Sequence, residues 1–84
     1  MAEHPNTFQL IIASVGETHF DSAAVAATLP TSAGEITILP HHEAFVTTLK
    51  PGIITVKVSA GETRTFDVEN GVLECSGNRV VVLL

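Results

Sequence analysis

Turn-forming residues interrupt the chain at short intervals, and this feature restricts the fold more than any other. Gly, Pro, Asn and Asp divide the 84 residues into short apolar or alternating segments. Residues 54–59 alternate between aliphatic and polar side chains, which predicts a strand with one buried and one solvated face. Ala23–Ala27 has some helical propensity, but Val25, Thr28 and Pro30 favour a strand there. The pattern predicts one all-β domain over residues 1–84, of the sandwich or barrel type.

The expected strands follow from this punctuation, with a break near Asp21 and Ser22 and a stop at Pro30. They are Phe8–Val15, Thr18–Asp21, Ala24–Leu29, Gly34–Leu39, Ala44–Leu49, Ile54–Ser59, Thr63–Val68, Val72–Cys75 and Val80–Leu84. A hairpin turn is expected at Ala60-Gly61-Glu62, and a rigid corner at Pro40-His41-His42. The last strand is wholly apolar, so we expect it to be central and covered on both faces, or to lie against a partner.

Composition and charge exclude several classes of function. Hydrophobic residues make up 45% of the chain and charged residues only 15%, which indicates a packed domain rather than a disordered segment. The formal net charge is −5, and the chain has neither Trp nor Tyr. Such a surface repels phosphates and anionic lipid and lacks aromatic platforms for bases, so nucleic-acid binding and direct lipid binding are disfavoured.

The compartment is indicated by the single cysteine and by the N-terminal segment. Cys75 has no second cysteine to pair with, which is typical of a reducing compartment. The first residues, Met-Ala-Glu-His-Pro-Asn, lack a basic region, and the apolar run Leu10–Ala13 is too short for a signal or a membrane span. We expect a cytoplasmic location with no insertion into the membrane.

Motifs for catalysis are not evident, so no catalytic, cofactor-binding or metal-binding residue is assigned. The chain has no glycine-rich loop ending in Gly-Lys-Ser or Gly-Lys-Thr, and no Gly-x-Ser-x-Gly elbow. The serines are expected to lack a paired histidine, and they are Ser14, Ser22, Ser32, Ser59 and Ser76. Cys75 is interpreted as an inert core thiol, and the carboxylates as solvated strand and turn residues.

His41-His42-Glu43 is the best remaining candidate for a site. Adjacent residues in an extended chain point to opposite faces, so these three side chains are not expected to converge on one ion. Two interpretations stay open. The histidines either form hydrogen bonds within the corner, or they contact a protein partner.

Several segments resemble, in order and spacing, the N-terminal β-sandwich of the ATP synthase epsilon subunit, called delta in mitochondria. The most specific is Ile38–Gly52, which is similar to the family's Tyr-Pro-Gly-His-x-Pro-Leu-Leu-Thr-x-Leu-x-x-Gly. Further segments with this resemblance are Phe8–Ser14, Phe20–Val25, Leu29–Glu35 and Phe66–Cys75, so the match covers Phe8 to Leu84.

Three positions depart from the family pattern, because Ser22, His41 and Asn70 stand where glycine is usual. Asn tolerates a positive φ, so Asn70 is expected to keep a left-handed turn. The resemblance also ends where family members continue into a pair of C-terminal helices.

The resemblance implies a compact antiparallel β-sandwich of two roughly five-stranded sheets without the C-terminal helical hairpin. It implies a non-catalytic rotor subunit in the central stalk of a proton-translocating ATP synthase, peripheral on the cytoplasmic face of the energy-transducing membrane. The implied partners are the gamma subunit and the c-ring, in a complex with the alpha and beta subunits. Without the hairpin, the chain should neither inhibit ATP hydrolysis nor bind ATP.

The resemblance also implies contacts for individual residues. Ser32, Gly34 and Glu35 would face the c-ring, and His42 and Thr47 would lie toward gamma. An apolar patch formed by Val46, Leu49 and the last strand fits either a synthase subunit, which needs a large interface with a helical partner, or a free-standing binding module. The main alternative is a free-standing β-sandwich that binds a peptide or small ligand. An enzyme would instead show a pocket with two convergent titratable groups.

Overall fold

Nine strands and no helix run through the part of the chain that the computed structural model describes, residues 6–58 and 61–84. The strands are β1 (Phe8–Ser14), β2 (Glu17–Ala24), β3 (Ala26–Thr31), β4 (Gly34–Ile38), β5 (Phe45–Leu49), β6 (Gly52–Lys57), β7 (Thr63–Val68), β8 (Gly71–Ser76) and β9 (Arg79–Leu83). In these residues no helix is long and apolar enough to cross a membrane. The predicted all-β class is confirmed.

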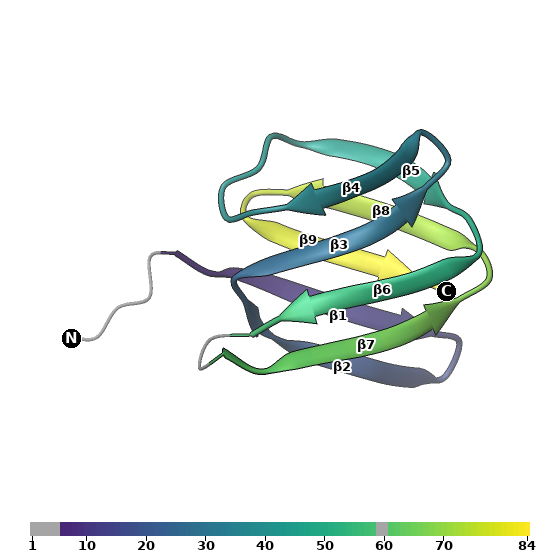
Figure 1. Ribbon diagram of the computed structural model, residues 1–84, viewed down its shortest axis with the longest axis horizontal. Coiled ribbons are helices and arrows are strands. Elements are labelled where there is room, and N and C mark those ends of the chain that lie inside the picture. The colour runs from purple at the N-terminus through teal and green to yellow at the C-terminus, as the bar shows by residue number, and fades with distance from the viewer. Residues whose placement is uncertain (1–5, 59–60) are drawn as a thin grey trace.

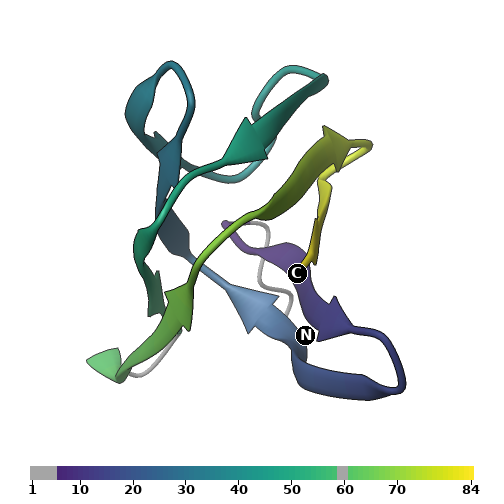
Figure 2. The same cartoon turned by 90° about the vertical axis from the view of Figure 1, so that its right-hand side faces the viewer.

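The strands form one continuous sheet that curls into two layers (Figures 1 and 2). One layer has the order β2-β1-β9-β8-β5, and the other contains β4, β3, β6 and β7. The layers are joined where Thr31 of β3 pairs with Leu49 of β5. The predicted sandwich is therefore confirmed, with five strands in one layer and four in the other among the described residues. The predicted antiparallel arrangement has an exception, because β1 and β9 are parallel.

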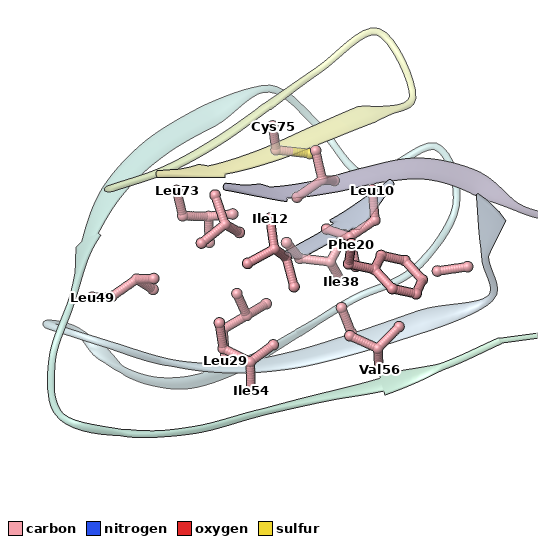
Figure 3. Close-up of a cluster of buried hydrophobic side chains, with 14 of the residues drawn as sticks. Leu10, Ile12, Phe20, Leu29, Ile38, Leu49, Ile54, Val56, Leu73 and Cys75 are labelled. Carbon is pink, nitrogen blue, oxygen red and sulfur yellow. The ribbon is translucent and has the colours of Figure 1, made fainter. Parts of the chain in front are cut away.

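The core lies between the two layers (Figure 3). It is formed by the side chains that point inward where buried and exposed residues alternate along each strand. Every strand contributes at least one side chain to it. The buried hydrophobic residues are Phe8, Leu10, Ile12, Phe20, Ala24, Ala27, Leu29, Ile38, Leu49, Ile54, Val56, Val68, Leu73, Cys75, Val80 and Val82. Where the edge strands β2 and β7 face each other, the rings of Phe20 and Phe66 meet edge to face at 5.8 Å.

Two expected strand breaks are wrong. β2 continues unbroken through Asp21 and Ser22, because both residues pair with β1, and the interruption falls at Val25 instead. Pro30 does not end β3. Proline lacks an N–H, but at this position its carbonyl oxygen accepts a hydrogen bond from the Lys50 N–H at 3.0 Å. The expected end of a strand at Ser59 and the turn residue Ala60 lie outside the described residues.

The apolar last strand occupies a central place, as predicted, because β9 lies between β1 and β8. Its inner side chains, Val80 and Val82, are buried. The expectation that both faces are covered is wrong for this chain alone. On the outer face Val81 is half-buried and Leu83 is 54% exposed.

Candidate partner-binding surfaces

The outer side of the five-stranded layer carries a band of aliphatic side chains, which we call the outer apolar face: Ile11, Val46, Val72, Val81 and Leu83. Register pairs Val72 with Leu83 and Val81 with Ile11 across neighbouring strands. Val46 is separated from Val81 by the exposed Glu74, which pairs with both, so Val46 lies at the edge of this face. Val46 is 68% exposed and Val72 is 42% exposed. Exposed aliphatic residues gathered on one sheet face mark an interaction surface.

The predicted apolar patch needs one correction. Leu49 is only 4% exposed and belongs to the core, since it alternates with the outward-facing Thr48. Val72 was missed, although its alternation with the buried Leu73 and Cys75 could have placed it on the outer face.

The corner between β4 and β5 holds His41 in the left-handed region, with φ of 64°. The residue therefore adopts the conformation for which glycine is favoured. The ring of His42 packs against Phe45 with centroids 5.0 Å apart, and its Nδ1 lies 2.9 Å from the carbonyl oxygen of Glu43. His42 is half-buried, whereas His41 and Glu43 are exposed. In the described part of the chain, no group of three or more His, Cys, Asp or Glu residues could hold a metal.

The loop between β3 and β4 is attached to β5 by Ser32. Its N–H donates to the carbonyl oxygen of Thr48 at 3.0 Å, and its Oγ lies 2.5 Å from the hydroxyl of Thr48. Gly34 has φ of 114°, which favours glycine, and Glu35 is exposed at the start of β4. These bonds hold the loop in one position and leave the Glu35 carboxylate in solvent.

The five predicted contact residues do not form one cluster. Ser32, Gly34 and Glu35 lie at one end of β4, and His42 lies beyond its other end (Figure 1). Thr47 is half-buried and shares the inner face of β5 with Phe45 and Leu49. Its neighbour Val46 points outward instead.

One expectation about the serines is wrong, because Ser14 does have a histidine beside it. Its Oγ lies 2.9 Å from His19 Nε2, and His19 Nδ1 lies 3.9 Å from a carboxylate oxygen of Glu17. The Glu17 side chain is 69% exposed and that of His19 is 31% exposed. Activation of a serine depends on preorganised donors in a water-excluded site. The geometry matches an ordinary hydrogen bond at the end of a hairpin.

Two further polar features have structural explanations. A shallow cleft between β2 and β7 is bordered by Arg64, whose guanidinium lies 5.5 Å from the Phe20 ring centroid and 5.9 Å from that of Phe66. Cys75 is buried in the core, and burial raises the pKa of its thiol. Cys75 therefore stays protonated near neutral pH, as the interpretation of an inert core thiol requires.

Comparison with known proteins identifies the family of this two-layered sheet. Residues 7–84 match the family described as ATP synthase, Delta/Epsilon chain, beta-sandwich domain. The chain belongs to this family. The ATP synthase epsilon chain of Thioalkalivibrio sulfidiphilus (strain HL-EbGR7) is 37% identical over 78 residues, and that of Delftia acidovorans (strain DSM 14801 / SPH-1) is 33% identical over 78 residues. The matches cover 92% and 93% of this chain, which spans 55% and 56% of the length of these two relatives.

Solved structures share the fold of this Delta/Epsilon domain. A chain of the Euglena gracilis mitochondrial ATP synthase, solved with OSCP, F1 and the c-ring, has a TM-score of 0.88 at 24% identity, covering 98% of this chain and 52% of that one. A chain of the central stalk and c-ring of the Tetrahymena thermophila mitochondrial ATP synthase has a TM-score of 0.75 at 12% identity, covering 89% of this chain and 60% of that one. At these identities the likeness concerns the fold alone.

Proposed function

We propose that this chain is a non-catalytic subunit of the central stalk of an F-type ATP synthase, which couples proton flow to ATP synthesis. The observation that carries the proposal is the outer apolar face, on a domain of the Delta/Epsilon family, because exposed aliphatic residues on neighbouring strands mark an interaction surface. The occupant we propose is the gamma subunit. The chain is then peripheral to the membrane, on its cytoplasmic face.

The c-ring is the second proposed partner, and it meets the loop of Ser32, Gly34 and Glu35. His42 and β5 face gamma, and Val46 rather than Thr47 supplies the aliphatic contact from β5, because Val46 points outward. A packed double-layered sheet is stiff, which suits a part that transmits rotation between two partners. The chain itself does no chemistry in this proposal. The alpha and beta subunits complete the complex.

The experiment measures the affinity of the purified chain for purified gamma subunit of the same organism. We expect Leu83→Asp and Val46→Asp each to raise the dissociation constant at least about tenfold, because each replaces an aliphatic contact by a carboxylate that loses its hydration when the partner covers it. Ile53→Asp is the matched control. Ile53 is 55% exposed, like Leu83, but it lies on β6 in the other layer.

The outcomes separate the possible functions. Equal weakening by Ile53→Asp would show that the effect is not specific to the outer apolar face. A wild-type chain that does not bind gamma overturns the proposal and favours a free-standing β-sandwich that binds a peptide or small ligand. Recovery of gamma and c subunits with the tagged chain from detergent-solubilised membranes supports the assignment to the complex.

A further inference from the structure

Asn78, in the turn between β8 and β9, connects three segments that are far apart in the sequence. Its Oδ1 accepts a hydrogen bond from the His41 N–H at 2.7 Å, across a separation of 37 residues. Its Nδ2 donates to the carbonyl oxygen of Thr7 at 2.9 Å, across 71 residues. Its own carbonyl oxygen accepts from the Gln9 N–H at 3.2 Å. One half-buried side chain therefore ties the corner to the beginning of β1.

The conformation of the corner explains why this tie matters. His41 has φ of 64°, a region that is unfavourable for a residue with a Cβ. The hydrogen bond from its N–H to Asn78 offsets part of that strain. The next residue is His42, whose ring is placed against Phe45. Because the two residues are adjacent, the backbone conformation of His41 influences where the His42 ring is placed.

The turn itself does not require the Asn78 side chain. Asn78 has φ of 59°, which glycine adopts with less strain. The turn conformation does not depend on the hydrogen bonds that the Asn78 side chain makes with Thr7 and His41. The two side-chain hydrogen bonds are thus a second role, separable from the backbone conformation.

We propose that Asn78 is a positioning residue that holds the corner at His41 and His42 in the shape that docks on gamma. The inference rests on the proposed function. A corner that samples other shapes binds with an affinity reduced by the fraction of molecules in the competent shape. If removal of the tie lowers this fraction to about one tenth, the dissociation constant rises about tenfold.

Two substitutions isolate the side chain. Asn78→Gly keeps the positive φ and removes both hydrogen bonds. Asn78→Asp keeps the acceptor for the His41 N–H and removes the donor to Thr7. We expect the dissociation constant for purified gamma to rise about tenfold in Asn78→Gly and less than about threefold in Asn78→Asp. The control is Asn70→Gly in the turn between β7 and β8, at the opposite end of the domain, which should leave the affinity unchanged.

The measurement is made well below the unfolding temperature of every variant, so that global unfolding does not contribute. Hydrogen exchange of the His41 amide is followed in the same samples, and we expect it to accelerate in Asn78→Gly but not in Asn78→Asp. Measuring affinity and hydrogen exchange in the same samples separates a local effect at the corner from a general loss of stability.

The results distinguish this inference from the proposed function. If wild-type chain binds gamma and Asn78→Gly binds equally well, the positioning role is wrong and the central-stalk proposal stands. If Asn78→Asp loses as much affinity as Asn78→Gly, the bond to His41 is not the one that matters, and the inference is also overturned. If wild-type chain fails to bind gamma, the proposed function is wrong and the inference is overturned with it.

Discussion

Cys75 shows how burial changes the chemistry of a single side chain in this domain. Its thiol lies in the core and is 2% exposed, and burial raises its pKa because the thiolate loses its hydration. The unfolded chain therefore releases this proton at a lower pH than the folded chain. By linkage, the contribution of the thiol to stability is complete below the unfolded pKa of about 8.5 and declines as the pH rises above it.

We predict that the free energy of unfolding falls above about pH 8.5 more steeply in the wild type than in Cys75→Val. All other titrating groups are common to both proteins, so their difference isolates the thiol. Urea unfolding at about pH 7 and about pH 9.5, on either side of the unfolded pKa, measures it. Parallel pH profiles for the two proteins would contradict the assignment.

Gly71 illustrates a second constraint at residue scale, the close approach of two backbones. A Cβ at this position would lie 2.5 Å from the carbonyl oxygen of Leu83 in the neighbouring strand. We predict that Gly71→Ala lowers the free energy of unfolding by about 1–3 kcal/mol, because the β8 and β9 backbones must separate. Thermal unfolding measures the change.

The control for this prediction is Gly16→Ala. Gly16 has a positive φ of 77°, but apart from Gly16 itself and its two chain neighbours, no atom of the described residues lies within 4 Å of the point that a Cβ would occupy. Only backbone strain of about 1 kcal/mol is therefore expected. If the two variants lose the same stability, the crowding at Gly71 is not the dominant effect.

At the scale of elements, the end of β3 joins the two layers. Thr31 pairs with Leu49 and is 1% exposed. Its hydroxyl donates to the carbonyl oxygen of Gly34 at 2.5 Å and accepts from the Ala33 N–H at 3.2 Å. A single buried hydroxyl thus completes the hydrogen bonding of the turn into β4.

We predict that Thr31→Val destabilises the domain by about 1–3 kcal/mol, because the valine leaves the Ala33 N–H and the Gly34 carbonyl without this partner. Thr37→Val is the matched control. Thr37 is exposed and shares its hydroxyl hydrogen bond with Thr28, so a change within about 0.5 kcal/mol is expected. Chemical denaturation of both variants gives the comparison, and equal losses would contradict the role of Thr31.

At the scale of the whole molecule, the two groups of proposed contacts lie at different ends. β4 separates Glu35 from the corner of His42, and its five residues extend roughly 15 Å. Sites this far apart, with no shared hydrogen bond, generally contribute independently.

We predict that Glu35→Lys weakens recovery of c subunits from solubilised membranes and leaves the affinity for isolated gamma within about twofold. His42→Ala should do the reverse, with a dissociation constant for gamma raised about tenfold. The recovery of c subunits and the dissociation constant for gamma are both measured for each variant, so that each variant is the control for the other. A loss of gamma affinity in Glu35→Lys equal to that in His42→Ala would show that the two ends are not independent.

The amino-acid order by itself determined the all-β class and most strand positions, because alternation and turn residues act over a few neighbouring positions. It also indicated the central place of the last strand and the corner at His41. Two of its failures concern strand ends: the break at Asp21 and Ser22 is closed by pairing with β1, and Pro30 stays in β3 because only its carbonyl is needed there.

Other features were decided by the tertiary structure, since they depend on which distant segments become neighbours. The parallel pairing of β1 with β9 is one of them. The left-handed backbone conformation is another. Among the described residues other than glycine, this conformation is found at His41 and Asn78 and not at Asn70. The prediction at Asn70 is therefore wrong. Five contact residues were named from sequence, but their separation along β4, the inward side of Thr47 and the tie from Asn78 to His41 and Thr7 all required the fold. Local pattern specifies which face of a strand is apolar, and only long-range packing decides which of those faces stays open to a partner.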